Sequence, residues 1–203
     1  AYYHDIGKLR NPEYYVENQL YMSNKHENLS PSMSSLILAS HVKDGLALAE
    51  EIKLARTVSN LIPEHHGTRL MKFFYQKAKD AAEGKERAVN EDDFRYPGPK
   101  PQSKAAAILM LADQVEAAAR TLQDPSPSQI RSMNRRLIQS TIQDRQFDEC
   151  EITMQDLDKI LRAFERVITG MHHHRIEYPG FDFNRGVEEE QFEQTQTESQ
   201  RIQ

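Results

Sequence analysis

The sequence predicts an all-α domain, because apolar side chains recur at helical spacing and no stretch of any length alternates as a strand would. The clearest predicted helix covers 103–122, where small and aliphatic residues form one apolar stripe. A second is predicted at 153–173, where Thr153 and Asp156 have the spacing of a capping box. A chain of 203 residues is long enough for one domain with a hydrophobic core.

The first part of the chain has few periodic apolar positions. We expect residues 1–7 to end a helix that stops at Gly7, because glycine often lies just past a helix C-terminus. Residues 8–30 contain Pro12 and several asparagines. They are predicted to form a loop with a single turn, in which His26 lies at the surface, with the alternative that it lines the entrance of a functional site.

The next helix is predicted to begin at Ser30-Pro31. Serine is a favoured N-cap, and proline is favoured at the first helical position. The helix should direct Leu36 and His41 toward the core. Residues 43–45, with the sequence Lys-Asp-Gly, are predicted to interrupt it, so that a short second helix follows.

The remaining helices are predicted from spacing and punctuation. Apolar residues in 54–65 recur at helical spacing, and Pro63 should kink or break that helix before the histidine pair. Helices are also predicted at 70–81 and 127–143. Residues 84–102 are charged and then rich in proline, so we expect a loop.

The sequence divides into a folded part and a polar end. We expect one domain over 1–180 and a disordered tail over 181–203, because the Glu- and Gln-rich tail cannot bury enough apolar surface to fold. Residues 172–174 are histidines at a predicted helix end. They should point in different directions, so we expect them to interact with the negative C-terminal end of the helix dipole rather than to bind a metal. Cys150 is the one cysteine, which excludes an internal disulfide.

Charge and hydropathy exclude several classes of function. A net charge of −5 argues against binding of a nucleic acid polymer. Residues 65–104 nevertheless carry nine basic and six acidic side chains, which could receive a small anion. No window reaches the roughly 18 apolar residues that span a bilayer. The chain begins at Ala1 rather than at a methionine, and a functional motif follows at once. We therefore expect an N-terminally truncated piece of a longer protein.

The most informative feature is an ordered set of metal-binding side chains: His4-Asp5, then His41, then His65-His66, then Asp113. Imidazole and carboxylate ligands suit Fe, Mn or Zn, and an aspartate can bridge two ions. Asp113 lies within an apolar helix, where a carboxylate without a cation would cost several kcal/mol. Two ions about 3.5–4 Å apart favour in-line attack on phosphorus. We therefore predict a dinuclear metal phosphohydrolase.

The motif His4-Asp5-Ile6-Gly7-Lys8 resembles the namesake motif of the HD-domain phosphohydrolases, an all-α superfamily of metal-dependent enzymes. Longer motifs resemble its PgpH-type branch, the seven-transmembrane HD family of cyclic-di-AMP phosphodiesterases. These motifs are Tyr15-Val16-Glu17-Asn18-Gln19, Leu29-Ser30-Pro31-Ser32, Ser40-His41-Val42-Lys43-Asp44-Gly45, Glu64-His65-His66-Gly67-Thr68, Lys72-Phe73-Phe74-Tyr75, Phe94 to Gln102, and Leu111-Ala112-Asp113. The resemblance covers 1–180 and implies an HD-domain helical bundle.

The resemblance also implies which residues hold metal. Asp5 would bridge two divalent transition-metal ions, with Mn or Fe favoured. One ion would be held by His4 and Asp113, and the other by the side chains His41, His65 and His66. The family uses a further histidine from the preceding helix, which this chain does not contain.

The activity implied is hydrolysis of cyclic-di-AMP to linear 5′-pApA through a metal-bridging hydroxide. The chain lacks the Gly-Tyr-Pro signature of relatives that cleave cyclic-di-GMP, and the resemblance therefore favours the adenine dinucleotide. It implies a cytoplasmic domain of a bacterial inner (plasma) membrane protein. The membrane would be contacted only through transmembrane segments that precede this chain. The expected partner is a cyclic dinucleotide, and a homodimer is left open.

Asp5 and Lys8 are the predicted catalytic residues, with Lys8 stabilising phosphate charge or protonating the leaving oxygen. Phe73 and Phe74 are expected in the core. Two alternatives stay open: another HD phosphohydrolase acting on cyclic-di-GMP or a nucleotide, and a catalytically weak nucleotide-sensing HD domain. The predicted substrate-binding residues are Lys8, Thr68, Arg69, Lys72, Tyr75, Arg95 and Tyr96.

Overall fold

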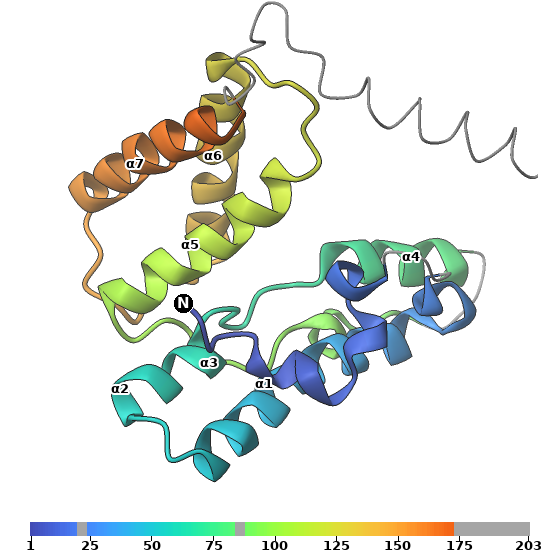
Figure 1. Ribbon diagram of the computed structural model, residues 1–203. Helices are drawn as coiled ribbons and strands as arrows, with labels where there is room; N and C mark the ends of the chain where they lie inside the picture. Colours follow the sequence, from blue (N-terminus) through green and yellow to red (C-terminus); the bar gives the residue numbers. More distant parts are fainter. Residues whose placement is uncertain (20–23, 84–87, 173–203) are drawn as a thin grey trace, which may run out of the picture. The chain divides into compact units, whose positions relative to one another are not determined.

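A computed structural model of the chain describes residues 1–19, 24–83 and 88–172 (Figure 1). The chain divides into two compact units, 1–169 and 170–203, and the first contains every site discussed below. The predicted disordered tail at 181–203, and two of the three histidines at 172–174, lie outside the described residues. No helix in the described part is both long and apolar enough to cross a membrane.

The all-α prediction is confirmed. Over the described ranges the chain forms helices and turns, and the only β-type pairing is an isolated bridge between Leu70 and Arg95. The α-helices are α1 (Pro31–Glu51), α2 (Arg56–Ser59), α3 (Leu61–Glu64), α4 (Lys72–Ala82), α5 (Lys104–Ala119), α6 (Pro127–Gln143) and α7 (Met154–His172). Short 3₁₀ helices are η1 (Ile6–Arg10), η2 (Pro12–Tyr14), η3 (Val16–Asn18), η4 (Lys25–Asn28) and η5 (Glu91–Phe94).

Two glycines, Gly7 and Gly45, let η1 lie directly on α1. A Cβ on Gly7 would lie 1.9 Å from the carbonyl oxygen of His41 and 2.5 Å from the amide nitrogen of Gly45. The prediction that Gly7 stops a helix is therefore wrong, since η1 passes through it. The predicted interruption at 43–45 is also wrong. Helix α1 continues through Gly45, which is buried because η1 and Ile62 approach it closely.

The segment before the histidine pair breaks as Pro63 predicts. Helices α2 and α3 are separate single turns that meet at Asn60, and Pro63 lies inside α3. The prediction of one turn within 8–30 understated its structure, because η2, η3 and η4 all lie there. His26 is not at the surface, since it is 8% exposed and packs against the Tyr14 and Phe74 rings.

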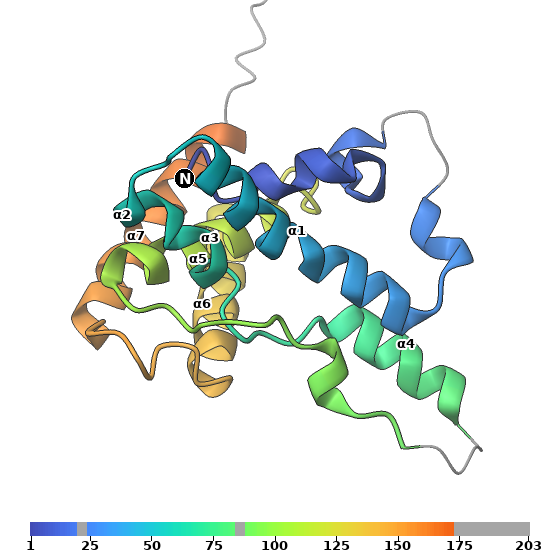
Figure 2. The same cartoon turned by 90° about the horizontal axis from the view of Figure 1, so that it is seen from below.

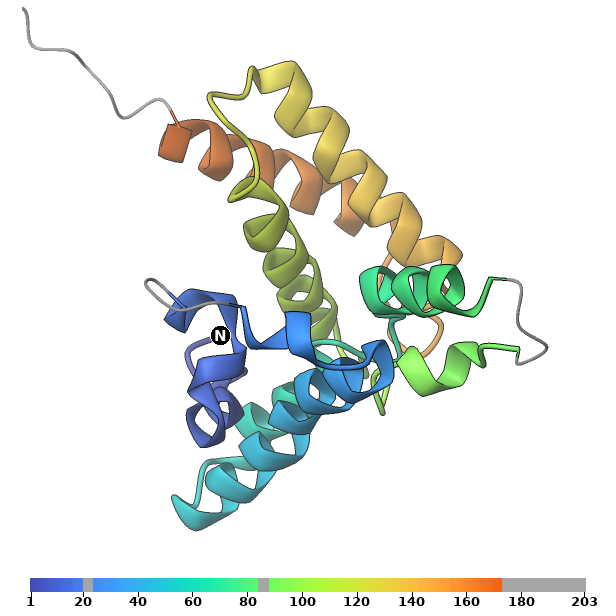
Figure 3. The same cartoon turned by 90° about the vertical axis from the view of Figure 1, so that its right-hand side faces the viewer.

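Helices α5, α6 and α7 pack together around a hydrophobic core (Figures 1 and 3). Ser126 and Gln129 form a capping box at the start of α6. Thr153 and Asp156 exchange the same pair of hydrogen bonds before α7, as predicted. The core of this group consists of Leu111, Val115, Ala119, Ile130, Met133, Ile138, Leu157, Ile160 and Ile168.

Helix α4 lies beside α1, as Figure 2 shows, and a smaller apolar cluster fills the contact between them. Phe74 is buried in that cluster, as predicted. Two other predictions of burial are wrong, because Phe73 is 71% exposed and Leu36 is 62% exposed. Helical spacing predicts that Phe73 and Leu36 face the core, whereas the residues that α4 and α1 bury are their sequence neighbours, Phe74 and Ser35.

Candidate metal centre

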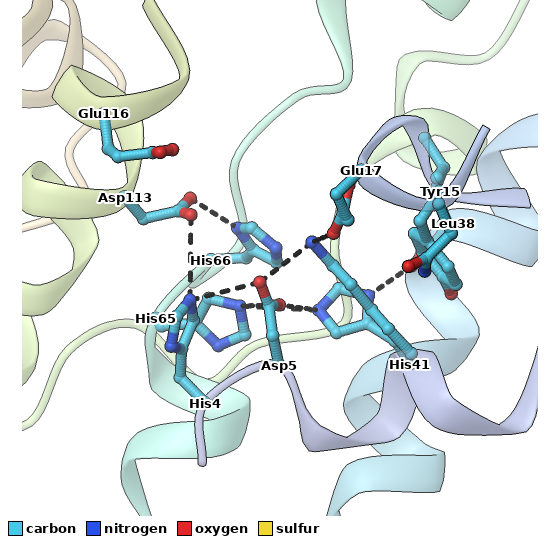
Figure 4. Close-up of polar contacts among 12 residues, drawn as sticks. His4, Asp5, Tyr15, Glu17, Leu38, His41, His65, His66, Asp113 and Glu116 are labelled. Carbon is cyan, nitrogen blue, oxygen red and sulfur yellow. Dashed lines mark hydrogen bonds and ion pairs between the residues drawn. The ribbon is translucent and has the colours of Figure 1, made fainter. Parts of the chain in front are cut away.

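Four separate segments bring the predicted metal-binding residues together (Figure 4). His4 and Asp5 precede η1, and His41 lies on α1. The turn after α3 carries the histidine pair, and α5 carries Asp113. The close contact between η1 and α1 at Gly7 places Asp5 directly opposite His41.

Hydrogen bonds to the backbone fix the orientation of three imidazole rings. Nδ1 of His41 lies 2.5 Å from the Leu38 carbonyl oxygen, and Nδ1 of His65 lies 2.6 Å from that of Ile62. Nδ1 of His4 makes the same contact with the Ala1 carbonyl oxygen at 2.5 Å. A carbonyl oxygen only accepts, so each Nδ1 must carry the proton. In the neutral rings the Nε2 lone pair is then free to bind a metal.

One group of possible metal ligands contains Asp5, His41, His65 and His66. The Nε2 atoms of His41 and His65 are 3.4 Å apart, and each lies 3.5 Å from Oδ1 of Asp5. Four ligands at about 2.1 Å from a tetrahedral ion would be about 3.4 Å from one another. The three distances therefore match the edges of a coordination polyhedron.

A second group contains His4, Asp5 and Asp113. Nε2 of His4 lies 3.2 Å from Oδ2 of Asp5 and 3.8 Å from Oδ1 of Asp113. The other oxygen of Asp113, Oδ2, is 3.7 Å from Nδ1 of His66. Asp5 thus offers one oxygen to each group, which is the arrangement that a bridging carboxylate needs.

Burial and close contacts between ionisable groups shift the pKa values of the side chains at this site. Burial lowers the pKa of His41 to about 4, and burial together with repulsion by its neighbours lowers that of His66 far below 6.5. Burial also disfavours the charged forms of His4 and Asp5, but their mutual contacts outweigh it. Interactions with Asp113 and Asp5 raise the pKa of His4 to about 10, and His4, His65 and Lys8 hold that of Asp5 well below its usual range.

Two buried polar atoms at the centre support a cation site. Oδ1 of Asp5 and Nδ1 of His66 are both buried and have no hydrogen-bond partner in the described part of the chain. Such groups normally cost about 1–3 kcal/mol each unless something pairs with them. In the Nδ1–H tautomer, the Nε2 lone pairs of His41 and His65 also face each other at 3.4 Å. A divalent cation would satisfy all these atoms, so the residues fit the metals that the sequence predicts.

Lys8 lies at the edge of the centre between two carboxylates. Its Nζ is 2.8 Å from Oδ2 of Asp5 and 2.6 Å from Oε1 of Glu17. Burial disfavours the ammonium form, but the two carboxylates outweigh burial and raise the pKa of Lys8. The Tyr15 ring lies beside the ammonium group, with its centroid 5.4 Å from Nζ. Lys8 is therefore held as a cation next to the shared carboxylate.

A cavity of about 500 Å³ opens beside the centre. The metal-binding side contributes Lys8, His41, His66 and Asp113 to its wall. The remainder of the wall is rich in aromatic rings and includes Tyr14, Tyr15, His26, Phe73, Phe74 and Tyr96. This combination suits a ligand that has both anionic groups and flat rings.

The residues predicted to contact substrate fall into two sets. Lys8 and Tyr96 line the cavity, and the Tyr96 ring stacks on His66 with centroids 4.1 Å apart. Arg69 is half-buried, and burial lowers the pKa of its guanidinium, which feels Tyr96 and Asp113. Its guanidinium has no hydrogen-bond partner among the described residues.

Arg69 does not line this cavity, and neither do the other four predicted substrate residues. Thr68 and Arg95 belong to a hydrogen-bond network behind the histidine pair. Lys72 donates a hydrogen bond to Oγ of Ser140, and Tyr75 packs against Phe94.

Sequence reasoning gives no role to Glu17 or Gln146, expects Phe73 in the core, and expects His26 at the surface or at the entrance of the site. Glu17, His26 and Phe73 line the cavity, and Gln146 contacts the segment that follows the histidine pair. Glu17 lies in a motif already quoted, so its charge next to a predicted catalytic lysine was a usable signal. Gln146 is far from the motifs in sequence, and no local pattern points to it.

Comparison with known proteins shows the family of this chain. The protein-family model of the HD domain matches residues 1–118. Cyclic-di-AMP phosphodiesterase PgpH of Bacillus subtilis is 45% identical over 179 residues, which cover 88% of this chain and 25% of that protein. The chain thus spans about a quarter of the length of this relative.

Two crystal structures of the Listeria monocytogenes PgpH HD domain are also similar to this chain. One matches with a TM-score of 0.78 at 40% identity, covering 85% of this chain and 79% of that one. The other, a complex with cyclic-di-AMP, matches with a TM-score of 0.79 at 40% identity, covering 84% and 78%. The resemblance to PgpH-type HD domains read from the motifs is confirmed.

Proposed function

Because this chain belongs to the HD domain family, whose members are metal-dependent, we propose that it is a phosphodiesterase that hydrolyses cyclic-di-AMP to linear 5′-pApA. We further propose that it uses two divalent transition-metal ions, Mn or Fe. The observation that carries the proposal is the position of Asp5, which offers one carboxylate oxygen to each of two groups of metal-binding atoms.

The proposed ligands divide into two sets. His4 and Asp113 would hold one ion, the three histidines from α1 and the turn after α3 would hold the other, and Asp5 would contribute one carboxylate oxygen to each. When bound, the ions supply Lewis-acid polarisation of the phosphate and a hydroxide nucleophile at neutral pH. Asp5 would bind both ions, and backbone carbonyls hold the His41 and His65 rings in the tautomer that presents Nε2.

Lys8 would assist by charge and by proton transfer. Its ammonium group lines the cavity next to Asp5 and keeps its proton at neutral pH. It can stabilise negative charge that develops on the phosphate, or donate a proton to the departing ribose oxygen. Glu17 holds Lys8 from the other side and so limits where Nζ can lie. Arg69, with its unpaired guanidinium, is a second candidate for the phosphate.

The cavity supports a dinucleotide rather than a small phosphate ester. Its volume of about 500 Å³ and its aromatic walls could hold a nucleobase while one phosphate lies at the metal-binding side. The adenine form is favoured by the relatives, since PgpH is named for cyclic-di-AMP and a similar HD domain is seen in complex with it. By the same relationship, the chain would be a cytoplasmic domain of a bacterial membrane protein.

The test is a product analysis on the chain with Mn²⁺ and, separately, Fe²⁺. Cyclic-di-AMP and cyclic-di-GMP would each be incubated with the chain and the products resolved by ion-exchange chromatography. We expect 5′-pApA from the first substrate. Asp5→Asn should abolish its formation, whereas Asp124→Asn, a change at an exposed residue between α5 and α6, should not.

Each other result would replace the proposal with a specific alternative. Hydrolysis of cyclic-di-GMP alone would assign the guanine dinucleotide. Binding of cyclic-di-AMP without turnover by the metal-loaded chain would indicate a sensing domain.

A further inference from the structure

We propose that Gln146, together with Arg95, is a positioning residue that sets how tightly the histidine pair binds its cation. The proposal rests on the assigned role of His65 and His66 as metal ligands in the proposed function. Gln146 lies in the connection between α6 and α7, outside the cavity and outside both groups of metal-binding atoms. It acts through Thr68, which follows the histidine pair by two residues.

The side-chain amide of Gln146 holds Thr68 on two sides. Gln146 is fully buried, and its Oε1 accepts a hydrogen bond of 3.0 Å from the Thr68 backbone N–H. Its Nε2 donates to Oγ1 of Thr68 at 3.0 Å and to Oδ2 of Asp144 at 3.1 Å. Both ends of one amide are therefore used, and a shorter or apolar side chain could not replace it.

Arg95 completes the contact from the opposite direction. Its Nη1 donates to the Thr68 carbonyl oxygen at 2.7 Å, and its Nη2 donates to Oδ1 of Asp144 at 3.0 Å. The N–H, hydroxyl and carbonyl groups of Thr68 are thus all engaged. Asp144 accepts from both Gln146 and Arg95, and this links the two partners of Thr68 into one partly buried network.

The backbone between the histidines and Thr68 is shaped to fit against Gln146. Gly67 has a φ of +57°, and a Cβ there would lie 2.4 Å from Oε1 of Gln146. On the other side of the pair, buried Glu64 accepts a hydrogen bond of 2.9 Å from the Gln102 backbone N–H. His65 and His66 are therefore fixed at both ends by residues that do not bind metal.

A small movement of this segment matters because metal bonds tolerate little error. Ligand distances in metal sites are expected to stay within about 0.2 Å of their ordinary values. Loss of outer partners of ligating histidines typically lowers metal affinity about 10–100-fold. We therefore expect removal of the Gln146 amide to raise the dissociation constant for Mn²⁺ or Zn²⁺ within that range.

The experiment compares metal affinity with stability in matched variants. Mn²⁺ and Zn²⁺ affinities would be measured by competition with a chromophoric chelator, and unfolding of the metal-free chain by urea. Gln146→Leu should weaken binding about 10–100-fold, and Thr68→Val, which removes only the hydroxyl, should weaken it less. Thr68→Ser should bind as the wild type does. Leu157→Ala removes a buried core side chain away from the segment, so it should lose stability and keep wild-type affinity.

The outcomes separate this proposal from the proposed function. If Gln146→Leu and Leu157→Ala lose similar stability and both keep wild-type affinity, the role of Gln146 is only structural and this inference fails. Should Gln146→Leu not fold, Thr68→Val against Thr68→Ser decides in the same way. A wild-type chain that binds cations but cleaves no dinucleotide would overturn the proposed function and leave this inference standing.

Discussion

Replacement of Gly7 by alanine tests whether the approach of η1 to α1 builds the metal centre. The added Cβ would lie 1.9 Å from the carbonyl oxygen of His41, and ordinary contact begins near 3.4 Å. The neighbours within 3 Å are all backbone atoms of α1, so no side-chain rotation relieves the clash. The two segments must separate by about 1.5 Å, which is the difference between these two distances.

That separation would carry Asp5 away from His41. Oδ1 of Asp5 and Nε2 of His41 are 3.5 Å apart, so they would become about 5 Å apart. Two atoms that far apart cannot both lie about 2.1 Å from one ion. We expect Gly7→Ala to lose the ion that His41 is proposed to hold, and to destabilise the metal-free chain by about 1–3 kcal/mol, as overpacking usually does.

The assay measures bound metal per chain after dialysis, together with urea unfolding of the metal-free form. Gly170→Ala is the matched control, because a Cβ there meets no heavy atom within 4 Å and alanine favours a helix. It should leave metal content unchanged. A folded Gly7→Ala chain that retains the wild-type amount of metal would show that this backbone contact does not set the ligand spacing.

Three further outcomes follow from the contacts described. Thr153→Ala removes the hydroxyl that pairs with Asp156 and should lower the unfolding free energy by about 1 kcal/mol, measured in urea, without changing metal content. His4 has a pKa raised from 6.5 to about 10, so its contribution to the stability of the metal-free chain is complete below pH 6.5 and should be lost as pH rises toward 10. In urea unfolding measured across this pH range, His4→Gln should remove the fall of the unfolding free energy with pH. If the fall persists in His4→Gln, another group causes it. Lys8→Met should lower kcat for the dinucleotide roughly 100-fold with little change in metal content. Glu17→Gln should lower kcat less. An unchanged kcat in Lys8→Met would exclude a catalytic role for Lys8.

Features encoded by neighbouring residues could be predicted from the sequence. The bounds predicted for α6 agree with the structure, because Ser126 and Pro127 define its start and its apolar spacing is regular. The break at Asn60, three residues before Pro63, has the same local origin. The set of candidate metal ligands could also be chosen from the sequence, since its members are unusual residue types at helix ends or within apolar stripes, and the structure brings these side chains close together.

Features that depend on contacts between distant segments were not predictable. Gly45 resembles a helix stop by its neighbours, but it is there to let η1 approach. Thr68 and Arg95 resemble phosphate-binding residues, whereas the structure pairs both of them with residues of the α6–α7 connection. Phe73 resembles a core residue by composition, and only the position of α4 shows that it lines a cavity.

The donors of this centre come from segments that lie 36 to 109 residues after the N-terminal pair, counted from Asp5 to His41 and from His4 to Asp113. Bound ions would therefore act as cross-links that tie the N-terminal turn to three helical segments. An ion present at 100 times its dissociation constant would add about 2.7 kcal/mol to the stability of the fold. Depletion of the metal would then do more than stop hydrolysis. By lowering the stability of the fold it would make the chain more susceptible to proteolysis, and so lower its amount in the cell.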